Sequence, residues 1–170
     1  SKNQHKVINS FKKLKKSDLI FKDYKLILTG GMKDEDKPFY DGLVKMAQDD
    51  KSIIIKPNVS FHELYDLYKK AFFYWHFTGL NVDENKHPEE VEHLGITPLE
   101  AMAMGCLTFC VKSGGPKENI KSGKTGFLFE TEAELFKMMK DVVKNSRQQT
   151  LIRQAAKDYI QEHFTFTKFK

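Results

Sequence analysis

Apolar residues recur along the chain with two spacings that alternate from segment to segment. Helical spacing, with apolar positions three or four residues apart, covers residues 3–16, 37–48, 61–71 and 150–161. Short apolar runs typical of buried strands lie at residues 25–29, 53–55, 72–75, 107–111 and 127–129. Strands that alternate with helices predict parallel βαβ units with right-handed crossovers. We therefore expect an α/β fold: a Rossmann-like, doubly wound parallel sheet with helices on both faces.

Local signals refine the helix starts. Ser60 with Glu63, and Thr131 with Glu134, have the spacing of capping boxes. A short helix is expected near residues 98–104 and an aromatic tail carries Phe164, Phe166 and Phe169. The segment at 113–116 is expected to be a loop.

The expected loops after strands are the natural place for a ligand. They are Gly30-Gly31, the turn at residues 57–59, the polar stretch at 76–94, and residues 113–116. In open parallel sheets, ligands bind beyond the carboxyl ends of the strands. The stretch at 76–94 is also longer than most loops of compact domains, and such loops are usually functional or disordered. We expect these segments to gather along one edge of the sheet.

The composition suits one globular domain over residues 1–170. Hydrophobic residues make up 40% and charged residues 30%, and no apolar run reaches the length of a membrane span. The first ten residues lack the apolar segment of a secretory signal. Cys106 and Cys110 are interpreted as buried, reduced thiols, which favours a cytoplasmic protein.

The net charge is +5, and Lys12, Lys13, Lys15 and Lys16 form the densest basic cluster. The solvated face of an amphipathic helix is the favoured interpretation of this cluster. Attraction to an anionic membrane surface or substrate stays open as an alternative. Nucleic acid is not expected as a partner, because zinc-finger spacings and RNP-like aromatic motifs are absent.

The most informative stretch is EHLGITPLEAMAMGC at residues 92–106. Glu92 and Glu100 are eight positions apart, and Gly95 allows a tight turn between them. Thr97 is expected to be the N-cap of a helix, with Pro98 at its first position. The N–H groups and the dipole of a helix N-terminus favour a phosphate, and a carboxylate one turn later can accept hydrogen bonds from sugar hydroxyls.

The spacing alone also allows a simpler, non-functional interpretation of each glutamate. Thr97-x-x-Glu100 is itself a capping box, which would make Glu100 a structural residue. Glu84, Glu89 and Glu90 are alternatives to Glu92 as the first functional glutamate, and any of these residues can be a solvated loop charge.

An ordered series of motifs resembles the retaining glycosyltransferases of the GT-B fold, in particular the C-terminal, donor-binding domain of glycosyltransferase family 4 (group 1). Besides the paired glutamates, the resemblance spans nearly the whole chain. It rests on Lys2-Asn3-Gln4 with Val7, Ile8 and Phe11, on LTGG at 28–31, on Val59-Ser60 with Glu63, Leu64 and Tyr68, on GGPKENI at 114–120, and on Gly123 with TGFLF at 125–129.

The resemblance implies roles at the matching positions. Glu100 would hold the ribose of the nucleotide, and Glu92 would contact hydroxyls of the donor sugar. Lys2 would neutralise the diphosphate, which backbone N–H groups around Gly95, Ile96 and Thr97 would also bind. The turn of Pro57, Asn58 and Val59 would receive the base, beside the glycine turn Gly30-Gly31. In the simpler interpretations, Lys2 is a terminal charge and Pro57 an ordinary turn residue.

Two departures from the family pattern stand out. The family places an arginine and a central β-strand just before the match to Lys2, and an aromatic residue where Leu94 stands. The family's N-terminal domain, with most of the acceptor site and commonly a histidine near the reaction centre, has no match here. None of the six histidines matches that histidine.

The resemblance implies transfer of a hexose from a UDP-, GDP- or ADP-sugar to the hydroxyl of an acceptor lipid or saccharide, with retention at the anomeric carbon. No cofactor or metal is expected. The expected partner is an N-terminal GT-B domain, upstream or in another chain, and the expected location is the cytoplasm, with the inner membrane face left open. A sugar-nucleotide epimerase and a non-catalytic nucleotide-binding subunit are the alternatives, and the donor domain alone is expected to show at most trace activity.

Overall fold

The structure is a computed structural model that describes residues 2–164, and it consists of two compact units. The first unit comprises residues 3–64. The second comprises the described residues from Tyr65 onward together with Lys2. The tail residues Phe166 and Phe169 lie outside the described part of the chain.

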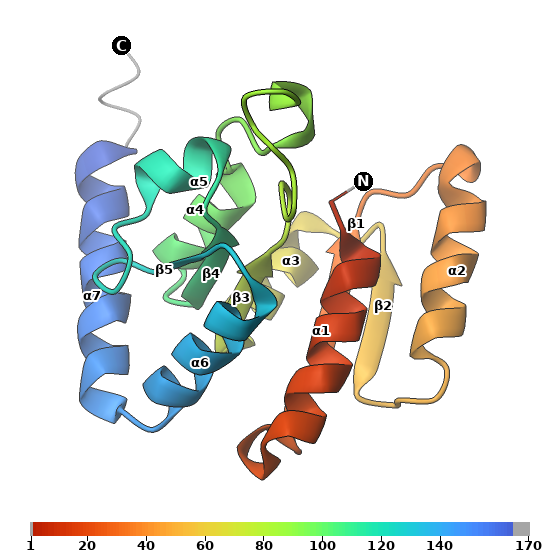
Figure 1. Ribbon diagram of the computed structural model, residues 1–170, viewed down its shortest axis with the longest axis horizontal. Coiled ribbons are helices and arrows are strands. Elements are labelled where there is room, and N and C mark those ends of the chain that lie inside the picture. The colour runs from red at the N-terminus through yellow and green to blue at the C-terminus, as the bar shows by residue number, and fades with distance from the viewer. Residues whose placement is uncertain (1, 165–170) are drawn as a thin grey trace. The chain divides into compact units, whose positions relative to one another are not determined.

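The first unit is a two-stranded parallel sheet with helices packed against it (Figure 1). Strands β1 and β2 pair in register from Leu26 opposite Ile53 to Gly30 opposite Pro57. Its elements are α1 (Gln4–Ser17), η1 (Leu19–Phe21), β1 (Leu26–Gly30), η2 (Asp34–Asp36), α2 (Lys37–Ala47), β2 (Ile53–Pro57) and the start of α3 (Phe61–Lys70).

Helix α1 buries the apolar face that its sequence predicts. Val7, Ile8, Phe11 and Leu14 are all at most 6% exposed. Of the four clustered lysines, Lys12 donates to the Met46 carbonyl at 2.6 Å, and Lys15 donates to Ser52 Oγ at 2.7 Å and lies 3.5 Å from Asp50. These contacts within the unit favour a structural role for Lys12 and Lys15, whereas Lys13 and Lys16 are exposed.

The second unit is a three-stranded parallel sheet in the order β3-β4-β5. Strand β4 is central and every residue in it is buried, as expected for a parallel strand with covered faces. Its elements are α3 from Tyr65 on, β3 (Phe73–His76), η3 (Pro88–Glu90), α4 (Ile96–Ala103), β4 (Leu107–Val111), α5 (Gly114–Asn119), β5 (Phe127–Phe129), α6 (Glu132–Val143) and α7 (Ser146–His163).

The two faces of β4 bury different side chains, because neighbours along a strand point to opposite faces. Cys110 packs in a cluster with Leu99 and Met102 of α4 and Ala156 of α7. The Phe109 ring lies instead against the rings of Phe73 and Phe127, with centroids 5.8 Å and 4.5 Å away. Both cysteines are buried free thiols, as the sequence predicts.

The α/β class with parallel strands is confirmed, and three details differ from the sequence-based expectation. The described strands form two hydrogen-bonded sheets where one was expected. Residues 114–119 form helix α5 although a loop was expected at 113–116, and α7 begins at Ser146, before the expected start at residue 150. Both predicted capping boxes are present, at Ser60 with Glu63 and at Thr131 with Glu134.

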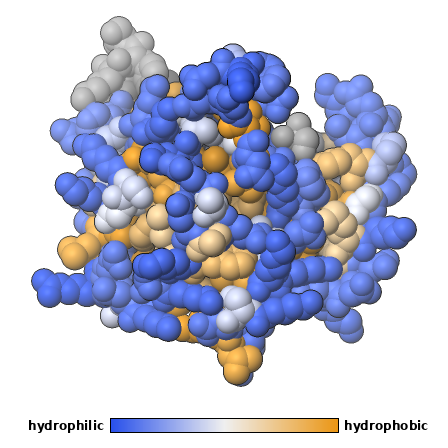
Figure 2. All heavy atoms as spheres, in the orientation of Figure 1, coloured by the Kyte–Doolittle hydropathy of each residue, from blue (hydrophilic) through white to orange (hydrophobic). Residues whose placement is uncertain are grey.

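Figure 2 shows a face on which hydrophilic atoms predominate, with hydrophobic atoms in smaller separate areas. Over residues 2–164, no helix is both long and apolar enough to cross a bilayer.

Two glycines bring the start of α5 against the main chain of residues 92–94. Gly114 has φ of 53°, and a Cβ on it would lie 2.2 Å from the Glu92 carbonyl oxygen. A Cβ on Gly115 would lie 2.3 Å from the His93 carbonyl oxygen. The Gly115 N–H donates to the Glu92 carbonyl at 2.8 Å. Because only glycine fits at these distances, the Gly-Gly pair allows α5 to fix the segment that carries Glu92.

We expect Gly115→Ala to lower the free energy of unfolding by about 2 kcal/mol or more, because its methyl group meets backbone atoms that cannot move aside cheaply. The measurement is chemical denaturation monitored by circular dichroism. Gly42→Ala in the exposed interior of α2 is the control. A Cβ there has nothing within 4 Å, so this change should stabilise by about 0.5–1 kcal/mol. Equal stability of both variants would contradict the close packing.

Candidate functional site

The candidate site of the second unit is built from segments that follow its strands. His76 ends β3 and opens the loop that leads to α4, while Ser113 follows β4 and leads to α5. The carboxyl ends of parallel strands lie at one edge of a sheet, so both loops emerge at the same edge. Lys2, Glu92, Gly95, Ile96, Thr97 and Glu100 all belong to this unit.

Helix α4 begins at Ile96, two residues earlier than it would with Thr97 as its N-cap. Its N-cap is Gly95, with φ of 79°, and neither half of the predicted Thr97–Glu100 capping box occurs. The interpretation of Thr97 as N-cap and Pro98 as first residue is therefore wrong. The left-handed backbone at Gly95 turns the chain directly into the helix, so Ile96 and Thr97 occupy the first turn, whose N–H groups lack intrahelical acceptors.

Thr97 and Glu100 are instead held by two tyrosines. Tyr74 donates to Thr97 Oγ1 at 2.9 Å, and Tyr68 donates to a Glu100 carboxylate oxygen at 3.2 Å. Burial, and then the neighbouring Glu100 charge, raises the pKa of Tyr68 well above its ordinary value, so the phenol keeps its proton. Glu100 is thus an oriented acceptor whose position is set from α3, and the structural explanation through a helix cap does not apply.

Glu92 is the centre of a small charged cluster. Its Oε2 lies 3.2 Å from Lys2 Nζ and 3.2 Å from His76 Nε2. The Gly95 N–H also acts on this carboxylate and helps to lower its pKa. Burial acts to raise the pKa of Glu92, but the hydrogen bond and charge of Lys2, together with His76 and Gly95, hold it below its ordinary value. Glu92 is therefore a carboxylate at neutral pH, with 18% of its side chain exposed.

His76 is the buried member of this cluster, with 4% of its side chain exposed, compared with 61% for Lys2. Burial is the main cause that lowers the pKa of His76, from 6.5 to about 4, against the opposing attraction of Glu92. The imidazole is therefore neutral at pH 7. Its Nε2 is at contact distance from Glu92, yet it has no well-aligned hydrogen bond within the described residues.

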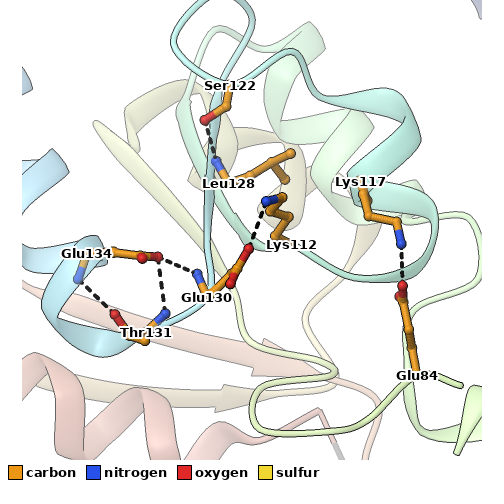
Figure 3. Close-up of polar contacts among 8 residues, drawn as sticks. All are labelled: Glu84, Lys112, Lys117, Ser122, Leu128, Glu130, Thr131 and Glu134. Atoms are coloured by element: carbon orange, nitrogen blue, oxygen red, sulfur yellow. Dashed lines mark hydrogen bonds and ion pairs between the residues drawn. The ribbon is translucent and has the colours of Figure 1, made fainter. Parts of the chain in front are cut away.

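A third carboxylate orders the long loop at 76–94. Glu84 accepts from the Gly114 N–H at 3.0 Å and forms an ion pair with Lys117 of α5 (Figure 3). The backbone of this loop also turns on itself, with the N–H groups of Lys86 and His87 bonded to the Asp83 carbonyl. Glu84 therefore fastens the loop to α5.

The remaining predicted residues belong to the first unit and meet at its strand ends. Gly30 and Pro57 are opposite each other in the β1–β2 register, and the Asn58 N–H donates to the Gly30 carbonyl at 2.9 Å. Asn58, with φ of 54°, also bonds through its side-chain amide to both backbone groups of Met32. Gly31 and Val59 flank these contacts in sequence, so the glycine turn and the 57–59 turn form one exposed loop pair.

Among the described residues, one exposed group of side chains could bind a metal ion. The possible ligand atoms of His87, Glu89 and Glu90 lie within 4.8 Å of one another. All three side chains are exposed, and His87 Nδ1 already lies 3.4 Å from Glu89. The group lies in the long loop and shares no residue with the Glu92 cluster.

Sequence reasoning missed His76, Tyr68 and Tyr74 as parts of the site. In the sequence, Tyr68 is part of a family-like motif and His76 is the first residue of the long polar stretch. The position of His76 could have indicated it, because His76 directly follows an apolar run predicted to be a strand, and ligands bind beyond the carboxyl ends of such strands. The tyrosines carry no such signal, because an aromatic residue at a helical or strand position is equally typical of the core.

The buried neutral imidazole predicts loss of stability in acid. In the unfolded chain His76 binds a proton near pH 6.5, whereas in the folded chain it does so near pH 4. The contribution of the neutral imidazole to the free energy of unfolding is therefore present above about pH 6.5 and is lost as the pH falls towards 4. By linkage this loss amounts to roughly 1–2 kcal/mol at pH 5. Denaturation curves between pH 8 and 4.5 measure it.

His76→Gln should flatten this acid-side slope, because the substituted side chain does not titrate. His87→Gln is the matched control, since His87 is exposed and pairs with Glu89, and it should keep the slope of the parent protein. An unchanged slope in His76→Gln would show that His76 is not buried as a neutral group.

Comparisons with known proteins identify a matching family and relatives of this chain. A family model described as "Glycosyl transferases group 1" matches residues 1–159. A mouse GDP-Man:Man(3)GlcNAc(2)-PP-Dol alpha-1,2-mannosyltransferase is 30% identical over 160 residues, which are 88% of this chain and 30% of the mouse protein. Human alpha-1,3/1,6-mannosyltransferase ALG2 is 56% identical over 41 residues, which are 24% of this chain and 10% of that protein. The chain therefore spans about a third or less of these curated relatives.

Solved structures share the fold at lower identity. The C-terminal domain of a group 1 family glycosyl transferase (LpcC) from Francisella tularensis has a TM-score of 0.74 and 22% identity, over 97% of this chain and 80% of that one. Anabaena HepE in complex with UDP and glucose has a TM-score of 0.77 and 17% identity, over 98% of this chain and 42% of that one. On the family match, which covers most of its length, this chain belongs to the group 1 glycosyl transferases.

Proposed function

We propose that this chain is the donor-binding, C-terminal domain of a retaining GT-B glycosyltransferase of family 4. It would take part in the transfer of a hexose from a nucleotide sugar to an acceptor hydroxyl. The observation that carries the proposal is the arrangement around the start of α4. Glu92 and Glu100 flank a glycine N-cap, and Lys2 lies 3.2 Å from Glu92.

The chemistry that this arrangement suits is the departure of a nucleoside diphosphate. Negative charge builds on the leaving phosphate oxygens while the sugar becomes oxocarbenium-like. The ammonium group of Lys2 carries a positive charge, and the N–H groups of Ile96 and Thr97 supply partial positive charge at the helix N-terminus. Such groups can stabilise the diphosphate without a metal ion.

The two glutamates suit different parts of the donor. Glu100 is oriented by the buried Tyr68 hydroxyl, so one carboxylate can accept hydrogen bonds from the two hydroxyls of a ribose. Glu92 keeps its negative charge and a partly exposed carboxylate, which suits hydroxyls of the transferred sugar. In the first unit, the exposed loop pair of Gly30-Gly31 and Pro57–Val59 stays our prediction for recognition of the base.

The relatives suggest which substrates to test first. The name of the mouse relative includes GDP-Man as donor and a dolichyl-diphosphate-linked glycan as acceptor. We propose GDP-mannose as the first donor for this chain and a lipid-linked saccharide as its acceptor, with UDP- and ADP-sugars as comparisons. An N-terminal GT-B domain, on the same polypeptide or in another chain, would supply the acceptor site. The proposed location is the cytoplasm, at the membrane face that presents such lipids.

Glu100→Gln separates ribose binding from structural support. The amide oxygen still accepts from Tyr68, so the free energy of unfolding should change by less than about 1 kcal/mol. The affinity for GDP or UDP, measured by calorimetry, should fall about tenfold or more because hydrogen bonds to a charged acceptor are lost. Glu130→Gln, which removes an exposed partner of Lys112 in the same unit, is the control and should bind like the parent. Full affinity with a collapsed melting temperature would make Glu100 structural.

The isolated 170 residues should show at most trace transfer. Alignment of an acceptor hydroxyl with the anomeric carbon accounts for several kcal/mol of such a barrier, and the proposed fold places that hydroxyl on the other domain. The test compares this chain with a polypeptide extended upstream, using the same donor and a panel of acceptor lipids and sugars. Robust transfer by the short chain would contradict the two-domain proposal. An altered nucleotide sugar formed without acceptor would favour an epimerase.

A further inference from the structure

Two side chains contact the Glu92 carboxylate, and they differ in how exposed each is. Lys2 is largely exposed at 61%, whereas His76 is 4% exposed at the end of β3. The main chain of Glu92 is fixed independently, because its carbonyl accepts from the Gly115 N–H at 2.8 Å. What remains undetermined is therefore the rotation of the carboxylate itself.

Lys2 cannot be the lasting support of that carboxylate if it also neutralises a diphosphate. An exposed lysine on four rotatable bonds readily changes partner, and an ion pair of this exposure contributes little by itself. A bound donor would draw the ammonium towards the phosphate oxygens. Glu92 would then lose the hydrogen bond that Lys2 donates at 3.2 Å and would need another donor to stay in place.

His76 is placed to be that donor. Its Nε2 lies 3.2 Å from the same oxygen, Oε2, yet this contact is not an aligned hydrogen bond. A small rotation of the carboxylate away from Lys2 can align it. The ring itself is restrained: it stacks at 6.4 Å on Tyr74, and His76 is opposite Cys110 in the β3–β4 register.

The charge state of the imidazole suits this task. The titratable or charged groups that face it are Glu92 and Lys2, with Tyr74 and Cys110 on the neighbouring strand positions. Burial keeps the ring neutral, so it donates one N–H without adding a positive charge. A cation held there would compete with the sugar hydroxyls for Glu92 and would weaken the attraction of the site for developing positive charge.

We propose that His76 is a positioning residue, which holds the Glu92 carboxylate for the donor sugar when Lys2 turns to the donor diphosphate. The proposal rests on the proposed function and deepens it, since it assigns a neutral donor to the sugar side of the site and a mobile cation to the phosphate side.

The test uses the polypeptide that shows transfer with its donor and acceptor. His76→Phe keeps an aromatic ring without a donor, and His76→Gln returns an N–H near the position of Nε2. We expect His76→Phe to lower kcat about tenfold or more, as misplacement of a reacting group does, while the Kd of the free nucleoside diphosphate stays within about twofold. His76→Gln should recover most of kcat. His87→Gln is the control for an exposed histidine and should behave like the parent.

A second readout does not depend on turnover. In ¹⁵N-labelled protein, the imidazole of His76 should be neutral at pH 7 with its proton on Nε2, and its resonances should shift in Glu92→Gln and again when the nucleotide sugar binds. The free nucleoside diphosphate should move them less, because it has no sugar to engage Glu92. Resonances indifferent to Glu92→Gln would overturn the contact on which the proposal depends.

A failure of the positioning role of His76 can be distinguished from a failure of the proposed function. An active parent protein whose His76→Phe variant keeps full kcat, or loses nucleoside diphosphate affinity as much as kcat, contradicts the positioning role alone. A folded, extended parent protein that neither binds nor transfers any nucleotide sugar contradicts the proposed function and this proposal with it.

Discussion

The close approach of Gly114 and Gly115 to the main chain of residues 92–94 is the contact on which the candidate site depends. It leaves no room for a Cβ at either glycine, and it includes the 2.8 Å bond from the Gly115 N–H to the Glu92 carbonyl. A loop in front of a helix would otherwise move freely. Here the long 76–94 loop ends in a fixed segment, because α5 holds it through backbone atoms that do not depend on any rotamer.

The groups that follow this fixed segment are placed partly by the backbone of α4 and partly by side chains from other elements. Gly95 turns the chain into α4, so the first helical N–H groups and Glu100 follow from one backbone conformation. Glu100 is then oriented by Tyr68 and Thr97 by Tyr74, both of which are supplied by elements that precede the loop. The start of α4 and the Glu100 carboxylate are therefore held in place. At Glu92, an exposed Lys2 leaves the site adjustable.

Much of the fold was predictable because its signals are local. Apolar runs located the five strands, and the capping boxes at Ser60 and Thr131 form as their spacing predicts. Two local predictions were wrong for one reason: tertiary packing overrode propensity. Thr97 has good capping chemistry, but the left-handed Gly95 starts the helix earlier and leaves Thr97 to bond Tyr74. Gly114-Gly115-Pro116 looks like a loop, but it opens α5 because close packing requires glycines there.

The site was less predictable than the fold, and His76 shows why. The spacing of Glu92 and Glu100 is visible in the sequence. The surroundings that set the protonation state of a side chain, however, come from residues distant along the chain. His76 is sixteen positions before Glu92, and its neutrality comes from burial at a strand end. A histidine has no sequence pattern that distinguishes a buried neutral donor from a solvated one. The role of a polar residue is therefore decided by which side chains the strand ends bring together, and for His76 that partner is the carboxylate that also binds Lys2.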